Sequence, residues 1–223
     1  LSDPDRLADS LQSAGIELAA IAFVQSWNGP EENEKERREA DEFISLLSRF
    51  PGAILCTVQM PEGRHDLEQR RLNLVANVNA VSRRAAEAGV PASFHPNSPE
   101  SSTNRTEEDY RVILEGLDTE ATGWTPDVGH IINGDMDPLS KMKEYESLIN
   151  LVHYKDWDGN PEFALMGEGK VERDKITQWL DDRDYTGWII CEDEAPQAME
   201  DPDAVTLHDG KWVQEILLPS ITR

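Results

Sequence analysis

The chain is poor in basic residues, and this shortage excludes whole classes of partner. Its 223 residues include 21 Lys and Arg against 44 Asp and Glu, which gives a formal net charge of −23 at pH 7. Duplex DNA and anionic membranes are bound through Lys and Arg, so the composition argues against nucleic-acid and membrane partners. The basic residues are scattered among acids, as in the segment 34–39. The simplest role of the acidic excess is solubility.

Cysteines and long apolar runs are also scarce. The two cysteines, Cys56 and Cys191, each lie in a short apolar run, so we expect buried free thiols rather than a disulfide or a metal pair. Free thiols suit a reducing compartment, which predicts a cytoplasmic location. No run approaches the roughly 18 apolar residues of a membrane-spanning helix, and no basic segment followed by an apolar run marks a signal peptide.

What the sequence does contain is a regular alternation of strand and helix patterns. Six short apolar runs, bounded by Gly or Pro, predict strands buried on both faces of a parallel sheet. They span residues 16–24, 53–59, 90–95, 123–128, 149–153 and 187–191. Helical patterns lie between them. Thr106 and the Asp137–Pro138 pair predict helix starts, and Gly15, Gly52 and Gly89 predict helix ends. The pattern therefore predicts repeated βα units in one domain over residues 1–223.

Two α/β folds fit six such units. One is an open, doubly wound sheet, and the other is a (β/α)8 barrel whose first two βα units lie upstream of Leu1. No glycine-rich nucleotide-binding motif follows any strand. Polar residues instead follow five successive strands, and only a barrel brings all strand ends to one rim. We therefore expect the barrel. These polar strand ends are Gln59, His95 to Asn97, Asp127 to His130, His153 to Asp156, and Glu192 to Glu194.

Three of these strand ends predict a metal site. Alone, Asp127 and His130 could be a helix cap and a surface histidine, and His153 could be a hydrogen-bonded core residue. Glu192 follows four apolar residues, where a carboxylate is costly unless it is paired, protonated or bound to a cation. Two carboxylates and an imidazole on neighbouring strand ends suit a divalent ion with mixed oxygen and nitrogen ligands, such as Mn, Mg, Co or Zn.

The motifs at residues 126–130 (PDVGH), 151–156 (LVHYKD), 166–169 (MGEG) and 185–192 (YTGWIICE) give the chain a family resemblance. They resemble the xylose isomerase-like TIM barrels of the sugar phosphate isomerase/epimerase superfamily. The resemblance implies an α/β fold of the (β/α)8 TIM barrel type. In that family the strand carrying the metal-binding Asp is the sixth, whereas Asp127 follows the fourth strand here. The resemblance therefore implies a barrel truncated at its N-terminus to about six βα units.

The resemblance also implies roles for individual residues. Asp127, His153 and Glu192 match metal ligands, and His130 matches a residue that faces metal and substrate. The family usually supplies one more glutamate from the preceding strand, and this chain has none there. His95 is the first candidate for the missing ligand and Glu100 the second. Mn is the expected ion, with Co, Zn and Mg left open.

We expect the chemistry to depend on a small set of residues at the rim. Glu192, His130 and Lys155 are the candidates for moving protons. Trp27 could stack on a sugar, and Trp188 is expected in the core. Arg105 could bind a carboxylate or phosphate, or lie exposed in its loop. The candidates for binding substrate are Asn97, Arg105, Trp157 and Glu168.

The expected function is a metal-dependent isomerase or epimerase that acts on a small sugar, polyol or derivative through an enediolate. In family epimerases, two metal-bound glutamates move protons on opposite faces of the sugar, and one of them is missing here. Two alternatives therefore stay open: a lyase similar to inosose dehydratase on the same metal site, and a non-catalytic sugar-binding barrel. A homo-oligomer is also left open.

Overall fold

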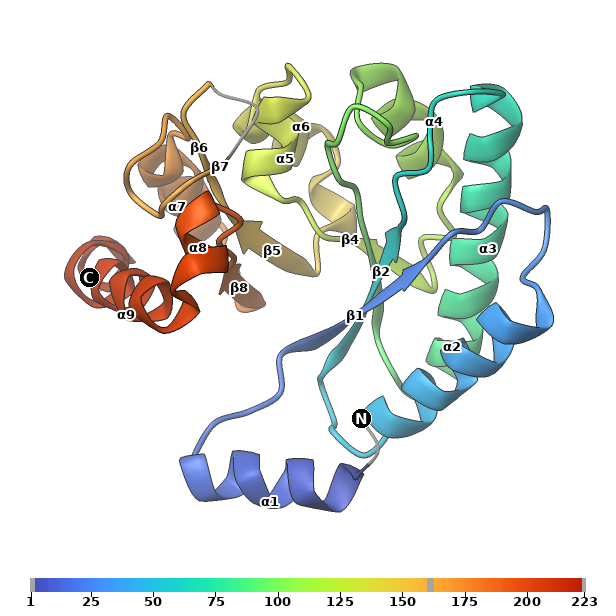
Figure 1. The fold of residues 1–223 in the computed structure, drawn as a ribbon, viewed down its shortest axis with the longest axis horizontal. Helices are drawn as coiled ribbons and strands as arrows, with labels where there is room; N and C mark the ends of the chain where they lie inside the picture. Colours follow the sequence, from blue (N-terminus) through green and yellow to red (C-terminus); the bar gives the residue numbers. More distant parts are fainter. Residues whose placement is uncertain (1–2, 160–162, 222–223) are drawn as a thin grey trace.

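Six parallel strands, in chain order, form the centre of the molecule (Figure 1). The computed structural model describes residues 3–159 and 163–221. Hydrogen bonds join β1, β2, β3 and β4 in one sheet and β5 with β8 in another, and two parallel bridges, Trp124 to Ile149 and Asp127 to His153, connect the two. The strands are β1 (Ala20–Gln25), β2 (Ile54–Gln59), β3 (Ala92–His95), β4 (Thr122–Trp124), β5 (Leu151–Tyr154) and β8 (Trp188–Cys191).

This strand order decides between the two predicted folds. A doubly wound sheet reverses its strand order at a switch point, so that helices cover both faces. Here each strand lies beside its predecessor without reversal, as in the wall of a barrel. The open-sheet alternative is therefore wrong, and the barrel prediction is confirmed. Within the described residues, the outer edges of β1 and β8 pair with no further strand.

Helices surround the strands and carry the connections between them (Figure 1). The other described elements are a 3₁₀ helix, η1 (Glu146–Leu148), a π-helical segment, η2 (Val213–Leu217), and a small antiparallel hairpin of β6 (Asp156–Trp157) and β7 (Phe163–Ala164). The helices are α1 (Pro4–Ala14), α2 (Glu34–Leu47), α3 (Leu67–Glu87), α4 (Glu107–Gly116), α5 (Val128–Asn133), α6 (Pro138–Glu144), α7 (Arg173–Asp181), α8 (Pro196–Glu200), α9 (Pro202–Trp212) and α10 (Leu218–Ile221).

The predicted helix starts and ends are confirmed by their hydrogen bonds, except at Gly52. The helix before Gly52, α2, already ends at Leu47 with Ser48 as its cap. The Thr106 side chain accepts from the Asp109 backbone N–H, and the Asp109 side chain accepts in return from Thr106, which forms a capping box at the start of α4. Asp137 caps α6, whose first residue is Pro138. Gly15 ends α1 in the left-handed region, at φ 65°.

Two tryptophans occupy positions opposite to those predicted. Trp27, a candidate for stacking on sugar, is fully buried against Phe23, so its ring offers no face to a ligand. Trp188, expected in the core, is 38% exposed because it begins β8 at the unpaired edge. Ile16 and Val24, beside the other unpaired edge, are exposed as well.

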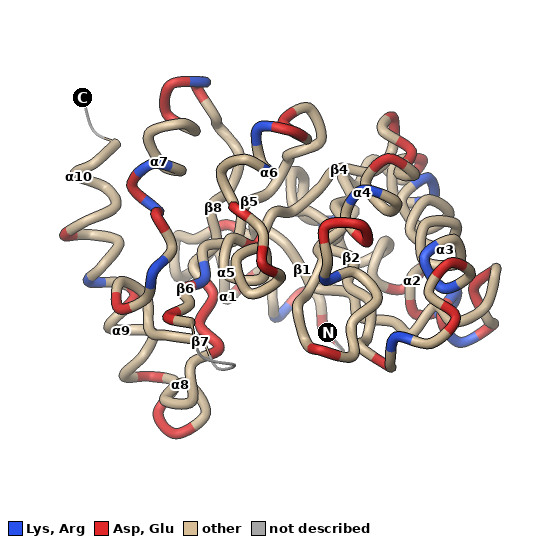
Figure 2. The backbone as a smooth tube through the Cα atoms, turned by 90° about the horizontal axis from the view of Figure 1, so that it is seen from above, with Lys and Arg blue, Asp and Glu red and all other residues tan. Residues whose placement is uncertain are grey.

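The remaining composition-based expectations concern thiols, charge and membrane spans. Cys56 and Cys191 are free, the first buried and the second half-buried. Figure 2 shows acidic positions spread over helices and loops, with basic ones among them. Within the part of the chain that the structure describes, no helix is both long and apolar enough to cross a membrane.

Candidate metal centre and active site

Four side chains from four neighbouring strand ends meet at one rim of the barrel. Each of His95, Asp127, His153 and Glu192 offers one ligand atom, and these atoms all lie within 4.8 Å of one another. His95 ends β3, Asp127 follows β4, His153 lies in β5 and Glu192 follows β8. Because the strands are parallel, their carboxyl ends lie at the same rim, where residues distant in sequence converge.

The two carboxylate oxygens of Asp127 have different roles. Oδ1 accepts a hydrogen bond of 2.9 Å from the His130 backbone N–H and so caps α5. Oδ2 lies 3.5 Å from His95 Nε2 and 3.2 Å from Lys155 Nζ. The helix-cap interpretation of Asp127 is therefore correct, but His130 is not a surface histidine, since it is buried.

His153 is oriented by Glu192. Its Nδ1 donates to Glu192 Oε2 over 2.8 Å, which leaves Nε2 as a free acceptor. Metal-binding histidines commonly donate their second ring nitrogen to a carboxylate in this way. Burial alone would raise the pKa of Glu192. The hydrogen bond from His153 and the charge of Lys155 outweigh burial and lower that pKa to about 2.

Several buried atoms of the cluster have no hydrogen-bond partner. They are both ring nitrogens of His95 and His153 Nε2. Asp127 Oδ2 also accepts no hydrogen bond, although it forms the ion pair with Lys155. A buried polar atom without a partner costs about 1–3 kcal/mol, so native proteins rarely leave several together. Two imidazoles and two carboxylates match the ligands that Zn, Mn and Co prefer. The residues present therefore fit a divalent cation.

Lys155 is the only cation among these carboxylates in the described structure, and it is fully buried. Its Nζ lies 3.2 Å from Asp127, 3.5 Å from Glu192 and 2.9 Å from Glu194. Burial would lower the pKa of Lys155, but the three carboxylates raise it above its usual value. The Lys155 charge likewise outweighs burial at Asp127 and holds the pKa of that carboxyl well below its usual range. Three carboxylates and one ammonium leave two negative charges, which one divalent ion would balance.

His130 lies beside Lys155, outside the set of ligand atoms. Its Nε2 is 3.1 Å from Lys155 Nζ and its Nδ1 is 2.8 Å from Ser98 Oγ. Burial lowers the pKa of His130 to about 3, so the ring is neutral at neutral pH. Phe163 packs edge-on against the His130 ring, at 5.1 Å between centroids, and its own ring faces Lys155.

Gly129 allows α5 to approach β5 closely enough for these contacts. A Cβ at this position would lie 2.8–2.9 Å from the side chain and carbonyl oxygen of Lys155. Contacts under 3 Å between such atoms essentially do not occur. The glycine in the PDVGH motif thus has a steric role in assembling the site.

None of the predicted substrate residues belongs to the cluster. Asn97 is buried in the loop after β3, donates to the Gln59 carbonyl and keeps an unpartnered Oδ1. Arg105 donates to the Asn133 carbonyl, which ties its loop to α5. Trp157 is half-buried in the β6–β7 hairpin. Glu168 is exposed, in the turn of the MGEG motif.

Of the two candidates for the missing glutamate, His95 lies in the cluster and Glu100 is exposed in the loop beyond it. Sequence reasoning missed Ser98 and Phe163 as neighbours of the catalytic candidates. Glu194, which the sequence placed at the same strand end as Glu192, does lie beside Lys155. Nothing in the pattern marked Ser98 or Phe163.

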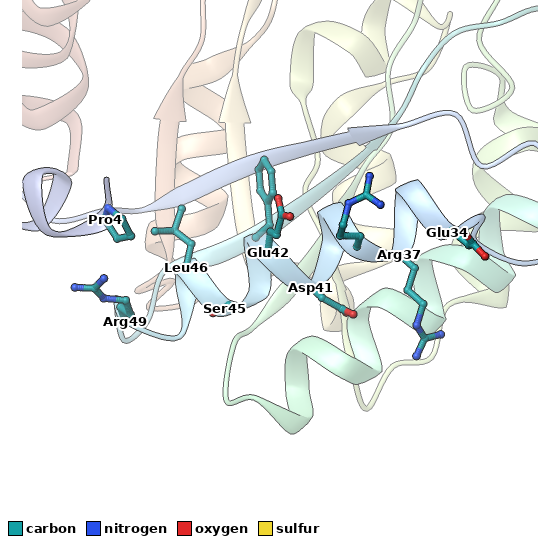
Figure 3. Close-up of a pocket in the computed structure, with 10 residues that line it drawn as sticks. Pro4, Glu34, Arg37, Asp41, Glu42, Ser45, Leu46 and Arg49 are labelled. Atoms are coloured by element: carbon teal, nitrogen blue, oxygen red, sulfur yellow. The ribbon is translucent and has the colours of Figure 1, made fainter. Parts of the chain in front are cut away.

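A hollow of about 990 Å³ lies away from this rim, beside α2 (Figure 3). Its lining includes Pro4, Phe43, Leu46 and Arg49, and it contains none of the predicted site residues. Figure 3 shows Pro4 of α1 at one end and Glu34 at the other. Its side chains supply no histidine and no cluster of ligand atoms, so the chemistry is expected at the rim.

Parallel strands in a barrel wall, with a His/Asp/Glu cluster at their carboxyl ends, define a TIM-barrel protein with a candidate divalent-metal site. The chain belongs to the xylose isomerase-like TIM barrel family, whose model matches residues 2–216.

Curated relatives share limited identity with this chain. An inosose dehydratase of Bacillus cereus (strain AH820) is 25% identical over 160 residues, which cover 64% of this chain and 53% of that protein. This match thus spans about half the length of the relative. An inosose dehydratase of Clostridium botulinum (strain Alaska E43 / Type E3) is 22% identical and covers 94% of this chain and 80% of that protein.

Solved structures confirm the fold. The IolI protein, solved with a zinc atom, superposes with a TM-score of 0.78 at 17% identity, over 95% of this chain and 81% of that one. The probable 3-DHS dehydratase AsbF of Bacillus anthracis gives 0.75 at 17% identity, with the same coverage. The 3-keto-D-glucoside 4-epimerase YcjR of E. coli gives 0.72 at 15% identity, over 96% of this chain and 84% of that one.

Proposed function

We propose that the protein is a divalent-metal-dependent enzyme that acts on a small keto-sugar, keto-polyol or related compound at this rim. The observation that carries the proposal is the cluster of His95, Asp127, His153 and Glu192, with its unpartnered buried atoms. The zinc atom in the IolI structure and the activities named for the dehydratase and epimerase relatives support it. When bound, the ion would supply Lewis-acid stabilisation of negative charge on substrate oxygens.

The chain's own residues supply the proton chemistry. Glu192, ionised and partly exposed, can take a proton from a carbon beside a carbonyl. Lys155 carries a proton held among three carboxylates and can donate to a substrate oxygen. His130, neutral and in contact with Lys155, accepts a hydrogen bond from its ammonium and so helps to orient it. Phe163 covers the His130–Lys155 pair and limits its contact with water.

Isomerases, epimerases and dehydratases share the first step, which is removal of a proton next to a carbonyl. They differ in the second step: an isomerase or epimerase returns the proton, whereas a dehydratase expels hydroxide. Our first candidate function is a metal-dependent isomerase or epimerase, and the second is a dehydratase of inosose-like substrates. The dehydratase is favoured by His95, which occupies the place where a second metal-bound carboxylate would serve two-base epimerisation.

The deciding experiment incubates the protein, loaded with Mn²⁺ or Zn²⁺, with a panel of inososes and keto-sugars in D₂O. An isomerase or epimerase incorporates deuterium at carbon without losing water, whereas a dehydratase gives a product lighter by one water, and mass spectrometry separates the two. Glu192→Gln should lower turnover at least 100-fold. Glu115→Gln, on the exposed face of α4, is the matched control and should leave turnover unchanged.

Two results would argue against the proposal. Turnover that survives both EDTA and Glu192→Gln would show that the cluster does not carry the reaction. Binding of a panel compound without any turnover or deuterium exchange would support a non-catalytic sugar-binding barrel instead.

A further inference from the structure

The hydrogen-bond partners of His130 determine which ring nitrogen carries its hydrogen. Nε2 lies 3.1 Å from Lys155 Nζ. An ammonium has only donors, so at this contact Nε2 has to be the acceptor. A neutral imidazole that accepts at Nε2 carries its hydrogen on Nδ1, and Nδ1 lies 2.8 Å from Ser98 Oγ. Ser98 is therefore the acceptor for the Nδ1 hydrogen.

Ser98 is itself held in place by a second side chain. Asn133 Nδ2 donates to Ser98 Oγ over 2.9 Å. Asn133 lies three residues after His130 on α5, so the two side chains share one face of the helix. Ser98 is buried in the loop after β3. The β3 loop and α5 thus meet at one hydroxyl group, and this hydroxyl accepts hydrogen bonds from both helix residues.

The ring of His130 has little freedom to turn. His95 packs edge-on at 5.6 Å and Phe163 edge-on at 5.1 Å between centroids, with interplanar angles of 89° and 84°. A ring flip would break the contacts at both nitrogens and would have to displace these neighbours. The side-chain orientation and the tautomer are therefore determined together.

We propose that Ser98 and Asn133 are positioning residues that hold His130 in its Nδ1–H tautomer, so that Nε2 remains a hydrogen-bond acceptor next to the donor Lys155. The role of this tautomer in catalysis rests on the proposed function. Nε2 has one lone pair, which accepts from Lys155 and so orients the ammonium. Lys155 carries only donors, so its remaining hydrogens favour a substrate that offers a carbonyl oxygen.

The tautomer can be measured without any substrate. Two-bond ¹H–¹⁵N correlation spectra of ¹⁵N-histidine-labelled, metal-free protein at neutral pH show which ring nitrogen is protonated. The chain has five histidines, so His130→Gln assigns the resonances of interest. We expect the wild-type His130 to show a protonated Nδ1 and an unprotonated Nε2. A protonated Nε2 in the wild type would overturn the proposal.

Variants then test the two positioning residues. Ser98→Ala removes the acceptor and should shift the His130 signals toward a mixture of tautomers, and Asn133→Ala should shift them in the same direction by less. Ser102→Ala is the matched control, because Ser102 is equally buried in the same loop but accepts from the Asn104 backbone. Unchanged His130 signals in both Ser98→Ala and Asn133→Ala would overturn the assignment. If Ser98→Ala does not fold, Asn133→Ala and the wild-type spectrum still decide.

Kinetics give a second reading once a substrate is identified. For histidines that bind a metal, loss of the hydrogen bond that orients the ring typically costs 10- to 100-fold in metal affinity or activity, and we use the lower end of that range for His130. We expect Ser98→Ala to lower kcat at least 10-fold with KM changed less than threefold, and Ser102→Ala to change neither. The tautomer measurement stands even if no panel compound is turned over, so failure of this inference and failure of the proposed function are distinguishable.

Discussion

At the scale of single residues, Asp127 connects local folding to the site. One oxygen of its carboxylate caps α5 and the other faces His95 and Lys155. Its backbone also bridges to His153 on the neighbouring strand. The same residue thus starts a helix, joins two strands and contributes to the cluster, which explains why so short a motif gathers several roles.

His95 is the residue whose role in the cluster most needs a test. His95→Ala removes one of four ligand atoms, so we expect bound Zn or Mn to fall well below one ion per chain, by metal analysis after dialysis. His65→Ala, an exposed histidine, is the control and should retain full occupancy. Full occupancy in His95→Ala with lost turnover would assign His95 to substrate binding instead.

Asp209 gives a pH dependence that is independent of the cluster. Burial and the nearby charge of Asp193 raise its pKa to about 6, although His208 acts in the opposite direction. A raised carboxyl pKa means that the folded state binds the proton more tightly. Stability from this group is therefore present below pH 4 and is lost as the pH rises through 6.

Asp209→Asn should consequently stabilise the protein at pH 7 and have little effect at pH 4. Because the side chain is partly exposed, we expect a gain of about 1 kcal/mol rather than the full value of the shift. Chemical denaturation of the variant and the wild type at both pH values measures this difference. An equal change at pH 4 and pH 7 would show that charge on Asp209 is not the cause.

At the scale of elements, the hairpin and the loop after it depend on Asp156. Its buried carboxylate accepts from the backbone N–H groups of Trp157, Gly167, Gly169 and Val171. It also pairs with Arg173 at the start of α7. A Cβ at Gly169 would overlap Asp156 Oδ1, so only glycine permits this approach. The MGEG motif therefore serves to wrap a loop around one carboxylate.

In Asp156→Asn, an amide NH₂ group replaces one carboxylate oxygen, so a donor faces the backbone N–H donors of the loop. The substitution also removes the charged partner of Arg173. We expect a loss of about 3 kcal/mol or more in the free energy of unfolding, measured by urea denaturation. Asp203→Asn, exposed in the first turn of α9, should cost about 0.5 kcal/mol or less. Equal losses in the two variants would contradict the central role of Asp156.

At the scale of the whole molecule, the cluster couples four strand ends that are far apart in sequence. Without a metal ion, Asp127, Glu192 and Glu194 repel one another, and among the described residues Lys155 is the one ammonium that offsets them. We expect EDTA to lower the melting temperature and Mn²⁺ or Zn²⁺ to restore it. An ion at 100 times its Kd adds about 2.7 kcal/mol of stability.

The control for this melting experiment is His153→Ala, which should abolish the response to both EDTA and added ion. A wild-type protein whose melting temperature responds to neither EDTA nor metal would count against the metal site. A His153→Ala variant that responds like the wild type would place the ion elsewhere in the molecule.

The sequence by itself determined the six parallel strands and the helices that alternate with them, but not the β6–β7 hairpin. Near-continuous apolar runs such as residues 54–59 are typical of strands buried on both faces of a parallel sheet, and local hydrogen bonds at Thr106 and Asp137 begin their helices. Strand-end position also marked Asp127, His153 and Glu192, because parallel strands bring those ends to one rim. These inferences rest on periodicity and on contacts within a few residues, which a sequence displays directly.

Only the tertiary structure decided which side chains meet across the rim and which are buried. It placed His95 rather than Glu100 in the cluster, buried Trp27, exposed Trp188 and surrounded Lys155 with three carboxylates. It also brought Ser98 and Phe163 to His130. Each outcome depends on strand register, loop path or an unpaired edge, and those result from packing between distant segments that no local pattern encodes.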